Sequence, residues 1–354
     1  MAIFLTHGGT THYSSDSPSD EVMIGTVSGI FVIRRESASE WRLARKTLEG
    51  CHISALVFEP QSGLIFAGAH KGSIHASDDL GETWHHRDNG LTTKDVYCIN
   101  LVHAQNKTML YAGTEPARLF QSENLGESWS ELPALRSVAS APKWNFPVPP
   151  RIPHVKNIAF DPRDPKIIYA CIEQGGLLKS KDAGESWEDL QGFDEDVHRI
   201  RIRTSNPDWL FIATRAGIYQ SQNGGRNWEQ LTTESTGIGY PDALLIHPDR
   251  ENLMFMAGAR TRPFAWIKDR TADSQIARSR DGGKNWQILH QGLPEHVRGN
   301  MEAMVMEVTE ESVALFAGTS DGEIFHSDDE GEQWTKIIEN LPPLSKAHHY
   351  LNFR

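Results

Sequence analysis

Polar residues that can bind metals or move protons recur at one position of a repeated sequence pattern. Aligned on the small residue that ends the second apolar run of each repeat, the position fifteen to seventeen residues earlier is occupied by His52, Tyr97, His154, His198, Tyr240 and Asn300. Imidazole nitrogens are common ligands of zinc, copper, iron and manganese. We therefore predict a divalent transition metal held by His52, His154 and His198.

The same residues can also carry acid–base chemistry. His154 or His198 would act as the general base, and the phenols of Tyr97 or Tyr240 would act as the acid. A bound metal would polarise a substrate oxygen or lower the pKa of a coordinated water. Both routes predict an enzyme, and we expect a metal-dependent hydrolase or lyase.

Charged residues close to the ends of the second apolar runs are expected to bind the substrate. Arg215 and Arg260 can each bind a carboxylate or phosphate through two parallel hydrogen bonds. Glu115 and Glu173 add two carboxylates. Trp144 lies between them in the sequence, in a Pro-rich insertion. We therefore predict that these five residues bind a small polar or anionic substrate.

The repeats that position these residues share the motif Ser-x-(Asp/Asn)-x-Gly-x-x-Trp. It occurs six times, with its Trp at positions 84, 129, 187, 228, 286 and 334, and a degenerate seventh copy retains Glu36 and Trp41. Short apolar runs bounded by Gly, Pro, Asn and Asp surround each copy, as is typical of β-strands. Repeats of this length form arrays of units that pack on their neighbours. Four strands in each of seven units predict an all-β fold, a seven-bladed β-propeller.

With this motif the chain resembles the Asp-box (BNR-repeat) propellers, which include sialidases, sortilin-type receptors and photosystem assembly factors. The resemblance covers roughly residues 20–340. It implies that the motif residues lie on turns between third and fourth strands, away from the ligand-binding face, and serve a structural role. It implies no single activity, because one fold hosts unrelated chemistries.

We predict a single domain, residues 1–354, built of four-stranded antiparallel blades. The blades are expected near residues 20–48, 52–90, 95–132, 153–191, 197–232, 239–290 and 300–340. Because residues 6–19 are polar and turn-like, the C-terminal segment 348–353 is expected to supply the innermost strand of the first blade and close the ring. Ring closure removes exposed sheet edges. The insertions 133–154 and 259–278 are predicted to lie on the face that carries the site.

The inner strand of the fifth blade leaves two registers open. Residues 198–203 read His-Arg-Ile-Arg-Ile-Arg, so that every second residue shares a face. Alignment on Ala213 places His198 at the inner position, whereas alignment on Pro207 places Arg199 there. A slip of one residue exchanges the two faces of a strand.

Composition excludes several classes of protein. The formal net charge of -12 argues against bulk nucleic-acid binding, and the chain has no apolar run long enough to cross a membrane. Three widely spaced cysteines indicate a reducing compartment, and the first residues show no secretory leader. We therefore expect a cytoplasmic protein that binds neither nucleic acid nor membrane.

Two other functions are left open. A non-catalytic scaffold would bind a protein partner through loops 133–154 and 259–278, where exposed aromatic residues are expected to be binding hot spots. The aromatic residues of these loops are Trp144, Phe146, Phe264 and Trp266. A glycoside hydrolase or sialidase-like enzyme is the second alternative. It requires two facing carboxylates, for which Glu115 and Glu173 are the available pair.

Overall fold

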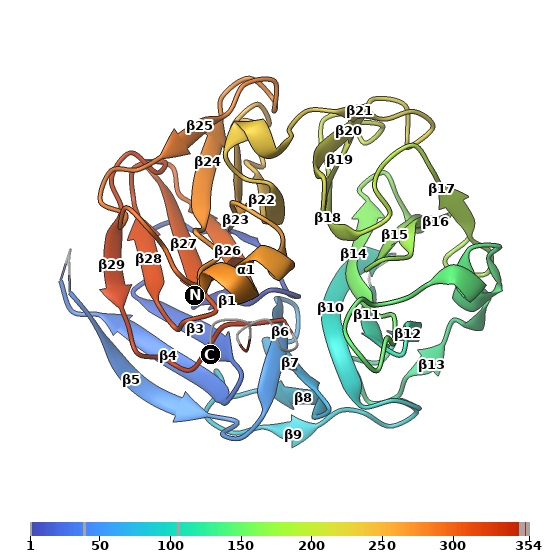
Figure 1. Ribbon diagram of the computed structural model, residues 1–354. Helices are drawn as coiled ribbons and strands as arrows, with labels where there is room; N and C mark the ends of the chain where they lie inside the picture. Colours follow the sequence, from blue (N-terminus) through green and yellow to red (C-terminus); the bar gives the residue numbers. More distant parts are fainter. Residues whose placement is uncertain (1, 38–39, 105–106, 347–350, 352–354) are drawn as a thin grey trace. The chain divides into compact units, whose positions relative to one another are not determined.

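The computed structural model describes residues 2–37, 40–104, 107–346 and 351. The described strands form seven sheets, and the fold is the predicted seven-bladed β-propeller of four-stranded blades, one of which carries a fifth strand (Figure 1). The chain divides into two compact units. Unit 1 comprises residues 1–53 and 231–354, and unit 2 comprises residues 54–230.

Unit 2 carries four blades, and its first strand begins at the boundary between the units. The strands of the first two blades are β6 (His52–Glu59), β7 (Leu64–His70), β8 (Ser73–Ser77), β9 (His85–His86), β10 (Asp95–Ala104), β11 (Lys107–Glu115), β12 (Arg118–Ser122) and β13 (Ser130–Glu131). Those of the next two are β14 (Val155–Asp161), β15 (Asp164–Ile172), β16 (Gly176–Ser180), β17 (Glu188–Leu190), β18 (Val197–Ile202), β19 (Leu210–Thr214), β20 (Gly217–Ser221) and β21 (Glu229–Gln230). The insertion 133–154 contains two 3-10 turns, η1 (Pro133–Ser137) and η2 (Ala141–Lys143).

Unit 1 carries three blades. Its first blade consists of β1 (Ile3–Leu5), β3 (Glu21–Thr26), β4 (Gly29–Arg35) and β5 (Trp41–Thr47). The second consists of β22 (Tyr240–Ile246), β23 (Met254–Ala259), β24 (Gln275–Ser279) and β25 (Gln287–Leu289). The third consists of β26 (Met301–Val308), β27 (Val313–Thr319), β28 (Ile324–Ser327) and β29 (Thr335–Ile338), with β2 (His12–Ser14) added parallel to β26. A 3-10 turn, η3 (Glu234–Thr236), precedes β22, and the insertion 259–278 contains the helix α1 (Pro263–Asp269).

The innermost strand of the first blade corrects one sequence-based expectation. The strand β1 occupies this position and pairs with Val22–Ile24 of β3 in parallel, so the blade is not wholly antiparallel. Ile3, Phe4 and Leu5 are all buried, which explains why this short apolar segment takes the inner place. The segment 348–353, which was expected there, lies outside the described residues except for Leu351.

The Asp-box residues form the predicted turns between third and fourth strands. In the turn between β8 and β9, the hydroxyl of Ser77 donates to Asp79 over 2.7 Å and accepts from the backbone N–H of Gly81 over 2.8 Å. Hydrogen bonds from the side chain and backbone of Thr83, and then from Ser77, hold the pKa of Asp79 below its usual range. The Trp84 indole donates to the Gly81 carbonyl over 3.2 Å. These residues therefore stabilise turns, as the resemblance implied.

Candidate functional site

A repeated β-bulge positions the polar side chains of the inner strands in unit 2. The ladders β10/β11, β14/β15 and β18/β19 each skip one residue near the start of the inner strand. The skipped residues are Tyr97, Lys156 and His198. A bulge leaves one residue out of the ladder and redirects its side chain. All three side chains are buried, so the bulges place polar groups where a regular strand would place apolar ones.

The same bulge occurs in unit 1. In the β22/β23 and β26/β27 ladders the skipped residues are Asp242 and Glu302, and both are buried. The equivalent residues in these blades are therefore Asp242 and Glu302, two positions after the expected Tyr240 and Asn300. Lys156 likewise stands two positions after His154. In blade five the bulge decides the register: Arg199 pairs with Ala213, and His198 is the bulged residue.

A buried acid–base cluster surrounds His154 in unit 2. The imidazole Nε2 of His154 lies 2.8 Å from a carboxylate oxygen of Glu173, and Lys156 Nζ lies 2.8 Å from the same oxygen. On its other side, His154 Nδ1 lies 3.7 Å from Glu115 Oε2. The Tyr97 ring stacks on the His154 ring with centroids 3.8 Å apart. Three other predicted site residues, Tyr97, Glu115 and Glu173, therefore surround the His154 imidazole.

The protonation of this cluster follows from its burial. The Tyr97 hydroxyl donates to Glu115 Oε2 over 3.0 Å. Burial, and then the negative charges of Glu115 and Asp95, raise the pKa of Tyr97 well above its usual value, so the phenol keeps its proton. Burial also raises the pKa of Glu115, against the lowering effect of the hydrogen bond from Tyr97. The cluster thus contains a proton donor and a carboxylate with increased proton affinity.

Next to this cluster, Glu173, Asp196 and His198 form a group that can hold a metal ion. One ligand atom from each lies within 4.8 Å of the others, and all three residues are buried. His198 Nε2 lies 3.4 Å from Asp196 Oδ1. Burial alone would raise the pKa of Asp196, but the hydrogen bond and charge of His198 outweigh it and hold this pKa below its usual range. An imidazole and two carboxylates suit a first-row divalent metal.

This group differs from the predicted set of three histidines. Of the three predicted histidines, His198 belongs to this group together with the carboxylates of Glu173 and Asp196. His154 is outside the group and contacts it through Glu173. His52 belongs to unit 1, where its Nε2 lies 2.7 Å from the Ser345 carbonyl. The predicted set of site residues does not include Lys156 and Asp196. Lys156 could have been found, because it is a polar residue directly after Val155, the first residue of its inner strand. Asp196 precedes its strand, and no sequence pattern marks it.

The predicted substrate-binding arginines are already paired with carboxylates. Arg215 Nη2 lies 2.9 Å from Asp194, and Arg260 Nη1 lies 3.2 Å from Asp273. In unit 1, the buried ring of Tyr240 packs edge-on against Trp266 of α1 at 5.6 Å. Trp144 is half-buried, and its indole donates to Ser140 over 2.9 Å. The two tryptophans of the insertions therefore pack into the fold.

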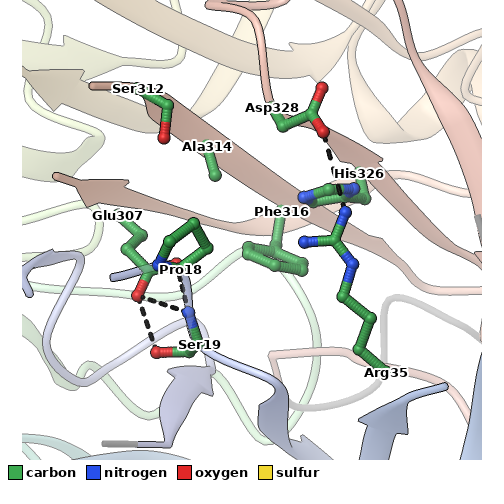
Figure 2. A pocket seen from close by; sticks show the side chains of 9 residues that line it. All are labelled: Pro18, Ser19, Arg35, Glu307, Ser312, Ala314, Phe316, His326 and Asp328. Carbon is green, nitrogen blue, oxygen red and sulfur yellow. Dashed lines mark hydrogen bonds and ion pairs between the residues drawn. The ribbon is translucent and has the colours of Figure 1, made fainter. Parts of the chain in front are cut away.

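A separate cavity of about 130 Å³ lies in unit 1, next to the Phe316 ring (Figure 2). Figure 2 shows Arg35 paired with Asp328 on one side of Phe316 and Glu307 bound to Ser19 on the other. The complete lining consists of Pro18, Ser19, Arg35, Glu307, Ser312, Ala314, Phe316, His326 and Asp328. The His326 ring lies against Phe316, with centroids 4.5 Å apart.

His326 predicts a pH dependence of stability. Burial, with a smaller effect of Arg35, lowers the pKa of His326 to about 4. The unfolded chain binds a proton near pH 6.5 and the folded chain does not, so stability falls as pH decreases from about 6.5 to about 4. We expect His326→Phe to remove about 3 kcal/mol of the decrease in unfolding free energy between pH 7 and pH 4. Urea denaturation at both pH values measures it, and an unchanged decrease would contradict the assignment.

Comparisons with known proteins agree on the fold. A family model described as Sortilin, neurotensin receptor 3, matches residues 175–296. An ancestral GH74 enzyme is 18% identical with a TM-score of 0.63, over 82% of this chain and 39% of that one. The GH74 enzyme of Niastella koreensis is 19% identical with a TM-score of 0.60, and the match covers 93% of this chain and 54% of that one. The structure described as YCF48 bound to D1 peptide is 16% identical with a TM-score of 0.55, and the match covers 93% of this chain and 87% of that one. A sequence search of curated proteins gives no match.

The chain is therefore a β-propeller that carries the Asp-box motif and is similar to these proteins, and the family model covers only residues 175–296. At identities of 16–19%, the similar structures show the fold alone. The chain spans 39% and 54% of the length of the two GH74 enzymes. Among the described residues, no helix combines the length and the apolar character needed to cross a bilayer.

Proposed function

We propose that this propeller is a cytoplasmic metal-dependent hydrolase or lyase that acts on a small polar or anionic substrate. The observation that carries the proposal is the group of Glu173, Asp196 and His198, whose ligand atoms lie within 4.8 Å of one another in a buried site. These donors suit zinc, copper, iron or manganese. The three cysteines are free thiols, which supports a reducing compartment.

The neighbouring residues have distinct roles in the proposed chemistry. A bound divalent metal would supply a Lewis acid that polarises a substrate oxygen or activates a water. His154, held by Glu173 over 2.8 Å, would accept a proton as the general base. Tyr97 keeps its phenolic proton because of its raised pKa and would donate it to a leaving group. Lys156 now pairs with Glu173 over 2.8 Å, and it would bind the anionic group of the substrate once a metal neutralises that carboxylate.

Metal analysis of the purified protein tests this proposal. We expect about one equivalent of divalent metal per wild-type chain, and a loss of affinity of about tenfold or more in Asp196→Asn, which keeps the shape of the side chain. His198→Ala should lose the metal altogether. His85→Ala removes an exposed imidazole and is the matched control, which should keep full occupancy. Wild-type protein that stays metal-free after incubation with each metal would refute the proposed centre.

Lys156→Met separates a metal centre from a purely structural ion pair. The Lys156 ammonium lies 2.8 Å from Glu173 and competes with a metal for its charge. We expect the variant to bind metal about tenfold more tightly and to be less stable only in the presence of a chelator, because a metal then replaces the lost cation. Calorimetric titration and thermal melts with and without metal measure both effects. Equal destabilisation with and without metal would assign Lys156 a structural role alone.

Two alternatives receive different support from the structure. A glycosidase mechanism on Glu115 and Glu173 is disfavoured, because the His154 imidazole lies between the two carboxylates and contacts both. A protein-binding scaffold is supported by α1, where Phe264 and Ile267 have exposed fractions of 80% and 53%. YCF48, with a similar fold, is seen bound to a peptide. A partner that co-purifies with wild type but not with Phe264→Ser would favour this second function.

A further inference from the structure

The C-terminal segment inserts a lysine among buried residues of unit 1. Lys346 is 3% exposed, and its ammonium forms an ion pair with Asp242. Its backbone N–H donates to Glu302 Oε2 over 2.6 Å. The ammonium also lies 5.3 Å from the centre of the Tyr240 ring, within the range of a cation–π contact. Two bulge residues and one aromatic face therefore bind a single lysine.

The surrounding strands hold the Asp242 carboxylate in place through bonds that do not involve Lys346. The second carboxylate oxygen of Asp242 accepts a hydrogen bond from Asn300 Nδ2 over 2.6 Å. The backbone N–H of Asn300 in turn donates to the Ser320 hydroxyl over 2.8 Å. Asp242, Asn300 and Glu302 are each at most 2% exposed. A carboxylate that is fixed by neighbours and removed from water requires a cation beside it.

We propose that Tyr240 and Asp242 form a recognition site for a primary alkylammonium group, of which Lys346 is the internal occupant, while Glu302 binds the backbone N–H of Lys346. A carboxylate and an aromatic face together select an ammonium, since the carboxylate accepts an N–H bond and the ring attracts the charge. A quaternary ammonium has no N–H to donate to Asp242. The ligand class is thus a lysine side chain or a small alkylamine. This site lies in unit 1 and does not depend on the metal centre proposed in unit 2.

Chemical rescue of Lys346→Ala tests this site in the full-length chain. We expect the variant to melt about 5 °C or more below wild type. Millimolar propylammonium should recover at least half of this decrease by occupying the vacated space, whereas it should leave the wild type unchanged. Tetramethylammonium chloride at the same concentration controls for ionic strength and should not rescue. Equal rescue by both salts, or rescue by neither, would overturn the proposal.

Two matched variants sharpen the test. Asp242→Asn in the Lys346→Ala background removes the carboxylate and should abolish rescue by propylammonium. Lys336→Ala removes a half-exposed lysine that pairs with Glu323 and Glu339, and propylammonium should not change its melting temperature. If Lys346→Ala does not fold alone, the refolding yield with propylammonium against tetramethylammonium gives the same comparison. A yield that is equal in both salts would then contradict the site.

Discussion

Asp242→Asn is expected to lower the free energy of unfolding by about 3–5 kcal/mol, because it leaves the buried Lys346 ammonium without its carboxylate partner. Both side chains are almost fully buried, at 4% and 2% exposure, so water cannot replace the lost partner. Urea denaturation of the purified variant measures this change. Asp328→Asn is the matched control, since Asp328 is 63% exposed and pairs with Arg35 over 3.7 Å. Its effect should stay below about 0.5 kcal/mol.

A double-mutant cycle shows whether the loss comes from this pair. In Asp242→Asn with Lys346→Met, neither charge remains, so the double variant should be more stable than Asp242→Asn alone. We expect a coupling energy of about 2 kcal/mol or more between the two positions. Additive effects, or a loss below about 1 kcal/mol in Asp242→Asn, would contradict a buried ion pair.

Gly292→Ala is expected to destabilise the protein by about 3 kcal/mol more than Gly50→Ala. The two glycines have nearly the same left-handed backbone, with φ of 80° and 82°. A Cβ on Gly292 would lie 1.9 Å from the Trp334 carbonyl oxygen, whereas a Cβ on Gly50 meets no atom within 4 Å. Both substitutions place an alanine in a left-handed conformation, which costs about 1 kcal/mol in each variant. The difference in stability between the two variants therefore measures the steric overlap at Gly292.

The Gly292 turn resists adjustment because it joins two blades of unit 1. The Trp334 backbone N–H donates to the Gln291 carbonyl over 2.9 Å, directly beside the overlap. Relief of the clash therefore requires that this hydrogen bond break. Thermal melts of both variants measure the difference. Equal melting temperatures for Gly292→Ala and Gly50→Ala would show that the turn adjusts without loss.

The sequence was sufficient to predict the fold because the Asp-box motif is local. Each motif forms its own turn through short-range bonds such as Ser77–Asp79, so every copy marks one blade. The inner strand of the first blade depends instead on pairing between Ile3–Leu5 and Val22–Ile24 across a polar segment. A parallel pairing between segments so far apart has no local sequence signal, and the polar residues 6–19 led to the expectation that the C-terminal segment supplies this strand.

The site was predicted in part, and the β-bulges explain the rest. The alignment assumes that every inner strand has the same register. In β10, β14, β18, β22 and β26, however, one extra residue changes which side chain lies outside the ladder. Tyr97 and His198 belong to the predicted set and are themselves bulged, whereas Lys156 and Asp242 are bulged residues that the prediction did not assign to the site. Asp196 and Lys346 come from segments outside the strands, and their contacts depend on tertiary structure alone.

The division of the chain also sets an order for folding during synthesis. Residues 54–230 are contiguous, so unit 2 has all of its strands as soon as they leave the ribosome. Residues 1–53 must wait for their partners in residues 231–354, and at 5–20 residues per second the delay until Phe316 is made lasts about 15–60 s. In the finished protein Val22 and Ile24 belong to the same hydrophobic core cluster as Val305 and Phe316, which are synthesised much later. The nascent N-terminal segment therefore exposes apolar strands for that interval and is the part of the chain on which chaperones should act.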